Sequence, residues 1–346
     1  MSALDHENRP ATDVPRHRWF RFGFQCAAGG LVAAAGSVLA AGWLPIGDMT
    51  PWAQLVAFRP QLGVGLLVLA GAMGLLVRAV RTLCLVLAVL AATSTVTLLG
   101  RVDGTVIAAD DSAVTVLSSN VMADGASVDE IVELAVTSRV DAVVLPEASR
   151  WFAASVTEGA RRRGLALVSQ TDEPLDPVDG MVTSDHVATG PFPTSVLVRT
   201  DLKPRFATAL PGALLGSLIA TVDVGGRQLN LVAVHPAPPL PGQVSRWRAD
   251  LGTVARWCAT PSIIAGDFNA TLDHPPFERL LDSGCVDAAA LSGNALTGTW
   301  PSSWPRLLAA PLDHVLLAGQ RRTVTSFAVH DITGSDHRAL LATVTP

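Results

Sequence analysis

The chain has 346 residues, of which 49% are hydrophobic and only 16% are Asp, Glu, Lys or Arg. This charged share is below the roughly 25% that is usual in soluble domains, so it disfavours a purely soluble protein and excludes a charge-rich disordered chain. Four Cys are too few for a disulfide scaffold, and the formal net charge of −5 argues against a strongly basic nucleic-acid coat.

Three stretches near the N-terminus, residues 22–47, 60–77 and 82–100, contain no Asp, Glu, Lys or Arg. About 20 apolar residues cross the hydrocarbon core of a bilayer, with about 17 as the lower limit, so each stretch is predicted to be a transmembrane helix. A cleaved signal peptide or a buried helical core is the alternative. Repetition of the uncharged stretch disfavours the first, and the lack of charge on every face disfavours the second.

The distribution of Arg predicts how these helices are oriented. Four Arg precede the first stretch, and Arg78 and Arg81 lie between the second and the third. Since short cytoplasmic loops are enriched in basic residues, the N-terminus is predicted to be cytoplasmic and the chain after Arg101 extracytoplasmic. The predicted organisation is a cytoplasmic tail at 1–21, a membrane domain of three transmembrane helices at 22–101, a linker at 102–112 and a folded domain at 113–346.

The folded domain is acidic and has ordinary strand and helix patterns, with 17 Lys and Arg against 26 Asp and Glu from residue 102 onward, a formal charge of −9. Ser127 and Ser149 are expected to cap helices that end near residues 138 and 163, and a third helix is expected at 244–258. A Gly-Gly pair at 225–226 predicts a hairpin turn. Strands are predicted at 113–121, 141–145, 165–169, 194–198, 216–224, 228–235, 261–265, 315–318, 323–329 and 339–344, with a long loop at 171–193. This mixture predicts two sheets packed face to face with helices outside.

Polar side chains stand at the ends of these predicted strands. A strand end is a rigid position from which side chains of several strands can point into one shared site. The candidates include two members of a Gly-Asp-Phe-Asn turn and two of a C-terminal Ser-Asp-His sequence. They are Asn120, Glu147, His235, Asp267, Asn269, Asp313, Asp336 and His337.

The residue types in this set indicate one kind of chemistry. Carboxylate and amide oxygens suit a hard cation such as Mg²⁺, and no Cys/His cluster has the spacing of a zinc site. A cation beside two histidines suits hydrolysis of a phosphate ester, because the cation neutralises phosphoryl oxygens while other groups move protons. The alternatives are that Asp267 and Asn269 form an ordinary Asx turn and that His235 only caps a strand. Their occurrence with Glu147 and the terminal Asp-His pair favours a functional site.

Taken in chain order, these motifs resemble those of the endonuclease/exonuclease/phosphatase superfamily over about residues 113–345. The resemblance implies the deoxyribonuclease I-like fold, a four-layer α/β/β/α sandwich, and hydrolysis of phosphate esters by in-line attack of water. It also implies a divalent cofactor, Mg²⁺ or alternatively Mn²⁺ or Ca²⁺. The chain has no Tyr, whereas some nuclease branches use a Tyr to contact the phosphate, and this weakens an abasic-endonuclease interpretation.

The resemblance also implies roles for the metal-binding residues. Glu147 matches the principal metal ligand, and Asn120 matches a residue that shapes the same metal site. Asp336 would lie next to the metal or to a second cation.

The remaining candidates match the catalytic residues of the family. Asp267 would orient or deprotonate the attacking water, and Asn269 would hold the phosphate or the water. His235 and His337 would contact phosphate oxygens. Asp313 would orient His337 and favour its charged form.

Several other polar or reactive residues are left with open interpretations. His314 should point to the opposite strand face from Asp313. The second Ser-Asp-His sequence, at 184–186, lies in the predicted loop without a following strand and is read as a coincidence or a substrate-loop element. Trp300 and Trp304 are either core residues or part of the rim of a cleft. A disulfide between Cys258 and Cys285 is chemically allowed if the domain is outside the cytoplasm.

Three functions remain open. The first is a membrane-anchored, outward-facing phosphoesterase acting on a lipid head group, a sugar phosphate or another small phosphoester. The second is an extracytoplasmic nuclease acting on DNA or RNA, and the third is a non-catalytic binding module. The acidic domain and its short link to the predicted membrane helices favour the first, because duplex binders usually offer a basic face. The lipid bilayer is the expected partner, and no feature of the sequence indicates a protein partner.

Overall fold

The computed structural model describes nearly all of the chain after residue 112 and part of the N-terminal region. The described residues are 47–76, 101, 104–108, 112–172 and 192–345 without 212 and 214, together with positions 36, 40, 82, 84–86, 88, 89 and 92. Most of the first and third predicted transmembrane spans and the Ser-Asp-His sequence at 184–186 therefore lie outside the described residues.

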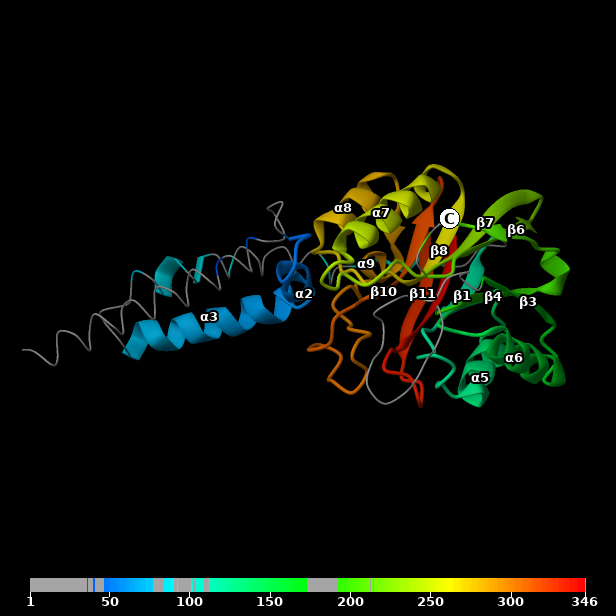
Figure 1. The fold of residues 1–346 in the computed structure, drawn as a ribbon, viewed down its shortest axis with the longest axis horizontal. Helices are drawn as coiled ribbons and strands as arrows, with labels where there is room; N and C mark the ends of the chain where they lie inside the picture. The colour runs from blue at the N-terminus through cyan, green and yellow to red at the C-terminus, as the bar shows by residue number, and fades with distance from the viewer. Residues whose placement is uncertain are drawn as a thin grey trace, which may run out of the picture.

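Two six-stranded sheets packed face to face form the centre of the molecule (Figure 1). The strand order is β11-β12-β1-β2-β4-β3 in the first sheet and β5-β6-β7-β8-β10-β9 in the second. The first sheet consists of β1 (Val114–Ser118), β2 (Ala142–Pro146), β3 (Leu167–Asp172), β4 (Thr194–Arg199), β11 (Thr323–His330) and β12 (Ala339–Thr345). The second sheet consists of β5 (Arg205–Thr208), β6 (Leu218–Val224), β7 (Arg227–Val234), β8 (Ser262–Asp267), β9 (Val286–Asp287) and β10 (Asp313–Ala318).

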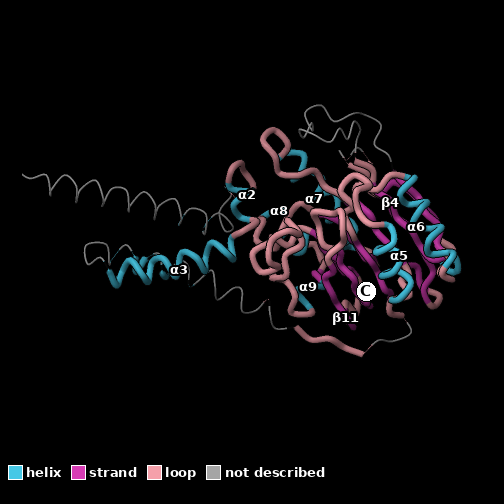
Figure 2. The backbone as a smooth tube through the Cα atoms, turned by 90° about the horizontal axis from the view of Figure 1, so that it is seen from below, coloured by secondary structure: helices cyan, strands magenta, loops and turns pink. Residues whose placement is uncertain are grey.

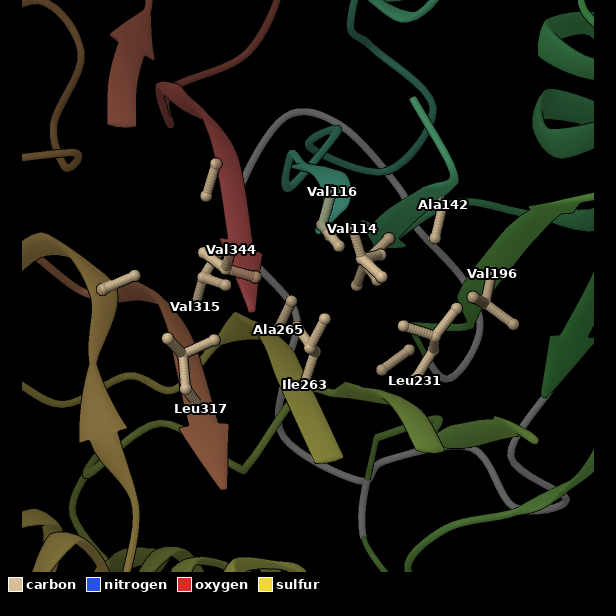
Figure 3. Close-up of a cluster of buried hydrophobic side chains, with 14 of the residues drawn as sticks. Val114, Val116, Ala142, Val196, Leu231, Ile263, Ala265, Val315, Leu317 and Val344 are labelled. Carbon is tan, nitrogen blue, oxygen red and sulfur yellow. The ribbon is translucent and has the colours of Figure 1, made fainter. Parts of the chain in front are cut away.

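The core between the sheets is built from alternate residues of these strands. Val114 and Val116 of β1 face this layer from the first sheet, and Ile263 and Ala265 of β8 face it from the second (Figure 3). Spacing by two residues puts one face of each strand into the core, so the β-branched and aliphatic patterns seen in the sequence become the inner layer.

Helices cover the outer face of each sheet (Figure 1). On the first sheet these are α5 (Val128–Thr137) and α6 (Arg150–Arg162), which bury residues such as Ile131 and Phe152. On the second sheet they are α7 (Val244–Val254), the 3-10 helix η3 (Ala255–Ala259) and α8 (Pro275–Asp282). Two short helices, η2 (Thr200–Leu202) and α9 (Ala288–Leu291), lie between strands in the sequence. The molecule thus has the predicted four layers, helix, sheet, sheet and helix.

Both helices that cover the first sheet, α5 and α6, begin at the serine caps predicted from the sequence. The Ser127 hydroxyl accepts a hydrogen bond from the backbone N–H of Glu130, and the Ser149 hydroxyl accepts one from Phe152. Such caps satisfy a helix N–H that has no partner within the helix and stabilise a helix by about 1 kcal/mol each. The two predicted helix starts are therefore confirmed.

The structure extends several predicted strands and adds two short ones. β5 and β9 were not predicted, and both lie at the edges of the second sheet. Asp267 is the last residue of β8, and Asp313 is the first residue of β10, where the sequence pattern had placed each outside its strand. Asp313 and Asp267 are direct partners in the antiparallel ladder. Neighbouring strands lie about 4.8 Å apart, so this pairing brings the two carboxylates together.

An N-terminal helical segment leaves the sandwich on one side. The short helix α2 (Trp52–Val56) lies against the sandwich, and α3 (Arg59–Leu76) extends away from it (Figures 1 and 2). α3 covers most of the second predicted transmembrane span. Within the part of the chain that the structure describes, no helix has both the length and the apolar character needed to cross a membrane. Membrane crossing therefore remains a prediction.

Candidate active site

The ends of neighbouring parallel strands place the candidate residues at one edge of the sandwich. β1 runs parallel to β2, and β7 runs parallel to β8. Residues that follow the carboxyl ends of parallel strands emerge at the same edge of a sheet, which here holds Asn120 and Glu147 in one sheet and His235 and Asp267 in the other. Because the two sheets face one another, all four side chains meet between them.

Asn120 links two carboxylates that belong to different sheets. Its amide Nδ2 donates to Oε1 of Glu147 and to Oδ2 of Asp267, both at 3.1 Å. Its Oδ1 accepts from the backbone N–H of Met122 at 2.9 Å, so the amide nitrogen rather than the oxygen faces the carboxylates. In this arrangement Asn120 orients both acids. Its role as a direct metal ligand stays a prediction.

Asp267 lies between two imidazoles. Its Oδ2 is 3.7 Å from Nε2 of His235 and 3.7 Å from Nε2 of His337. His337 also uses Nδ1 to contact Oδ2 of Asp313 at 2.8 Å. Asp267, Asp313 and His337 each offer one ligand atom, and these atoms lie within 4.8 Å of one another. The predicted catalytic set therefore comes together in three dimensions.

The Gly-Asp-Phe-Asn turn has the geometry that this position demands. Gly266 has φ +147°, and a Cβ there would lie 1.9 Å from the carbonyl oxygen of Val234 on the neighbouring strand, so only glycine fits. The Oδ1 of Asp267 accepts from the backbone N–H of Asn269 at 2.8 Å, and Asn269 donates from Nδ2 to Pro236 O at 3.1 Å. The Asx turn that the sequence left as an alternative is thus present, and it leaves Oδ2 of Asp267 facing the histidines.

Two site residues have an unusual backbone conformation. Glu147 has φ +62° and Asn269 has φ +49°, both in the left-handed region that residues with a Cβ seldom adopt. Such conformations cost about 1–3 kcal/mol and are found where a fold holds functional side chains in place. The strain here lies at positions that the sequence predicts to be functional.

These side chains line a cavity of about 390 Å³, called the site cavity below. Asn120 and Asp313 contact lining residues from behind. Six of the eight candidates line the cavity directly, namely Glu147, His235, Asp267, Asn269, Asp336 and His337.

Burial and charge set the protonation states in the cavity. Burial raises the pKa of Glu147 to about 7 and also raises the pKa of Asp267. Burial lowers the pKa of His235 to about 4, although Asp267 opposes the shift. For His337, burial acts in the same direction, but the carboxylates of Asp313 and Asp267 overcome it and raise its pKa to about 10. At neutral pH the site therefore contains one neutral and one charged imidazole.

The donor set fits a hard divalent cation. Glu147, Asp267 and Asp336 line one cavity, Asp267 is buried, and acids buried in this way are usually paired with a positive charge. His337 is charged and already bound to Asp313, which leaves it poorly suited as a ligand. The carboxylates around Glu147 are therefore the better candidates to hold an ion.

Three residues that the sequence analysis left out or open support the site. The indole Nε1 of Trp300 donates to Oδ2 of Asp336 at 3.0 Å, which makes Trp300 part of the cavity wall. The Ser335 hydroxyl donates to the carbonyl of Asn120 at 2.7 Å and accepts from the backbone N–H of His337 at 3.0 Å. The third, His274, also lines the cavity. Sequence offered a signal for Ser335, which begins the Ser-Asp-His motif, but none for His274.

His314 lies away from the cavity, as predicted. Its Nδ1 contacts Oδ2 of Asp287, and its Nε2 lies 2.9 Å from the carbonyl oxygen of Ala270. The disulfide that the sequence left open is present: Cys258 in η3 is bonded to Cys285, the residue before β9.

Two facing sheets with buried acids and imidazoles at one edge define the class of protein as an α/β-sandwich hydrolase. Residues 116–337 match the Endonuclease/Exonuclease/phosphatase family, and the chain belongs to this family. The protein is accordingly a metal-dependent hydrolase that acts on phosphate ester bonds.

Three solved structures have a similar fold. The human Nocturnin catalytic domain with bound sulfate has a TM-score of 0.52 at 17% identity, covering 70% of this chain and 96% of that one. D. rerio TDP2 complexed with single-strand DNA product has a TM-score of 0.51 at 16% identity, covering 68% and 100%. A family protein from Leptotrichia buccalis C-1013-b has a TM-score of 0.51 at 13% identity, covering 67% and 99%. Identities this low show the fold alone. No curated protein matches the chain significantly.

Proposed function

We propose that the protein is a membrane-anchored phosphoesterase whose catalytic domain faces outward and whose substrate is a membrane-associated or small phosphoester. The observation that supports this most strongly is the meeting of Glu147, Asp267, His235 and His337 around one cavity. The side chains come from both sheets, so only the complete fold assembles them.

Asp267 is the residue proposed to orient and deprotonate the attacking water. Its Oδ1 is held by the backbone of Asn269, and its Oδ2 faces the cavity beside both imidazoles. A raised pKa brings a carboxylate closer to the neutral range in which a general base works best. Asn269 would position the water or a phosphate oxygen in line with the ester bond to be broken.

The two histidines are proposed to contact the phosphate in different protonation states. His337, held as an imidazolium by Asp313, would stabilise negative charge on a phosphoryl oxygen. His235 is neutral and would donate a hydrogen bond from a ring nitrogen. In the described residues its Nδ1 has no hydrogen-bond partner, which sets it apart from His274 and His314.

The proposed cofactor is Mg²⁺, with Mn²⁺ or Ca²⁺ as alternatives. Glu147 and Asp336 would hold it, with Asn120 and Asp267 beside them. Such an ion neutralises phosphoryl oxygens and lowers the pKa of bound water.

Anchoring and orientation rest on the N-terminal sequence and on one feature of the fold. Three uncharged stretches and the placement of Arg support three crossings with the N-terminus inside. The Cys258–Cys285 disulfide supports an extracytoplasmic catalytic domain, because disulfides persist in oxidising compartments. DNA is the second candidate substrate, favoured by the single-strand DNA product in the similar D. rerio structure. The formal charge of −9 from residue 102 onward disfavours DNA as the substrate, because DNA-binding proteins usually offer a basic face to the phosphates.

A panel assay tests the proposal. The purified full chain is incubated with Mg²⁺ and, in parallel, with DNA, RNA, phospholipid vesicles and sugar phosphates. We expect release of phosphate-containing product from a lipid or small phosphoester, loss of activity with EDTA, and loss in Glu147→Ala and Asp267→Ala at unchanged folding. Glu158→Ala on the outer face of α6 is the control. Activity in Asp267→Ala equal to that of the wild type would contradict the catalytic assignment.

A further inference from the structure

One wall of the site cavity comes from outside the sandwich. Ala53, Ala57 and Phe58 line it together with the catalytic residues, although they precede β1 by more than fifty positions. They belong to α2 and to the turn that leads into α3, which lies where the N-terminal helices meet the sandwich (Figure 2). The sequence stretch between two predicted membrane spans is therefore next to the catalytic groups.

His274 fastens this segment to the catalytic domain. The backbone N–H of Thr271 donates to its Nδ1 at 2.7 Å, which puts the ring proton on Nε2. Nε2 then donates to the carbonyl oxygen of Ala53 at 2.7 Å. Gln54 makes a further side-chain hydrogen bond to the carbonyl oxygen of Pro239. α2 is thus bound through its backbone and its side chains to two loops of the site.

The neighbouring Asp273 binds two Arg residues that flank the second and third uncharged stretches, Arg59 before them and Arg101 after them. Arg59, at the start of α3, donates to its Oδ1 at 2.9 Å. Arg101, which follows the third uncharged stretch, donates to both oxygens at 2.8 and 3.0 Å. The carboxylate of Asp273 is buried, so this is a fixed attachment rather than a surface contact.

The wall that this segment builds is mainly apolar, with Gln54 as the polar residue among those of the segment that line the cavity. Ala57 and Phe58 pack against Leu312, which also lines the cavity, while Glu147, Asp267 and His337 lie in the same cavity. A second cavity of about 320 Å³ shares Ala57 and extends the apolar surface to Val64 of α3 and to Leu307. Val64 and Leu307 are 48% and 72% exposed. An apolar surface thus runs from the catalytic groups to the base of the helix that leaves the domain.

We infer that Ala53, Ala57 and Phe58 are part of the substrate-binding site and that they bind an apolar group esterified to the phosphate, so that the substrate is an amphiphilic phosphoester. This inference rests on the proposed function. The two kinds of surface share one cavity, so whatever lies on the apolar wall must be attached to, or adjoin, the phosphate held by the polar side. A cavity of this volume accommodates a small organic group in addition to a phosphate.

The test measures kcat/KM of the full chain with Mg²⁺ on p-nitrophenyl phosphodiesters whose second ester group runs from methyl to hexyl. Transfer of each methylene to an apolar wall predicts a rise of about fourfold per added carbon until the wall is covered. Ala57→Leu reduces the space, so the hexyl-to-methyl ratio of kcat/KM should fall. Phe58→Ala enlarges it, so the rise should continue to longer chains. Leu55→Phe is the matched control, since Leu55 lies on α2 but does not line the cavity.

The outcomes separate this inference from the proposed function. A kcat/KM that is the same for every chain length, or a hexyl-to-methyl ratio that Ala57→Leu and Leu55→Phe lower equally, would overturn the inference while hydrolysis itself upholds the proposed function. If the folded full chain cleaves no phosphoester of any length, nor any substrate of the panel, the proposed function fails and the inference fails with it. Thermal unfolding of each variant shows whether a lost ratio reflects lost folding.

Discussion

Nδ1 of His337 lies 2.8 Å from Oδ2 of Asp313, and Asp313 is the ladder partner of Asp267 on the adjacent strand. The antiparallel pairing of β8 with β10 therefore places one carboxylate behind the imidazole and another in front of it. Since both acids favour the protonated ring and raise its pKa to about 10, the strand register keeps His337 as an imidazolium at neutral pH.

The first prediction concerns this pair. Asp313→Asn removes the charge that holds His337 as an imidazolium, and we expect kcat on a small phosphodiester to fall by about 10²–10³-fold. Steady-state kinetics at neutral pH measure the loss, and circular dichroism confirms the fold.

A second Asp–His pair, with Asp287 on β9 and His314 on β10, offers the matched control. Asp287 contacts His314 in the same way, but neither residue lines the site cavity. Asp287→Asn should lower stability and leave kcat unchanged. Equal losses of kcat in the two variants would mean that Asp313 acts only through folding.

The second prediction concerns Glu147 and pH. Its pKa in the folded protein is about 7, against 4.5 for the unfolded chain, so the folded state holds a proton that the unfolded state has lost. The stability from this group is complete below pH 4.5 and is lost as pH rises through about 7. In metal-free protein, the free energy of unfolding of the wild type relative to Glu147→Gln should fall over this window.

The comparison with Glu147→Gln is needed because His235 acts in the opposite direction. Its lowered pKa of about 4 adds stability that is present above pH 6.5 and is lost as pH falls through 4. The difference between wild type and variant cancels this contribution. A difference that does not change between pH 4.5 and 7 would contradict the burial of a protonated Glu147.

The third prediction concerns the attachment of the N-terminal segment. Asp273→Ala leaves Arg59 and Arg101 without their shared carboxylate, and loss of one partner of a buried pair costs about 3–5 kcal/mol. Denaturant unfolding of the full chain should show this loss. Glu158→Ala, which breaks an exposed pair with Arg161, should have little effect. Equal effects would show that the contact with Asp273 contributes little.

The fourth prediction concerns the disulfide. Replacing both Cys258 and Cys285 by Ala should lower the free energy of unfolding by roughly 3.5 kcal/mol, the loop-closure contribution for a bridge across 27 positions. A thiol titration of the denatured wild type should find two free thiols, from Cys26 and Cys84. Four free thiols would rule out the bridge.

Much of the fold follows from local patterns in the sequence. Features that depend only on short-range geometry could be predicted from the sequence. They are the caps at Ser127 and Ser149, the Gly225–Gly226 hairpin and the alternation of buried residues in β1 and β8. The short edge strands β5 and β9 could not be predicted, because each gains its structure from a neighbouring strand rather than from its own residues.

In the candidate site, too, some residues could be predicted from local sequence and others could not. All eight candidates come together because each lies at or near the end of a strand, a property that the sequence pattern displays. Trp300 and His274 were missed or left open because their roles depend on contacts with Asp336 and Ala53, residues distant in the chain. The contribution of α2 to the cavity depends on tertiary docking alone, and no local pattern in residues 47–59 indicates it.

The central claim is that carboxylate oxygens of Glu147 and Asp336 hold a divalent ion next to the catalytic carboxylate of Asp267. Anomalous diffraction from crystals grown with Mn²⁺ tests this claim most directly. The account predicts a single strong peak within coordination distance of the Glu147 carboxylate, bordered by Asp267 or Asp336. A site that contains no Mn²⁺, or a peak bound only elsewhere in the protein while the enzyme is active, would contradict it.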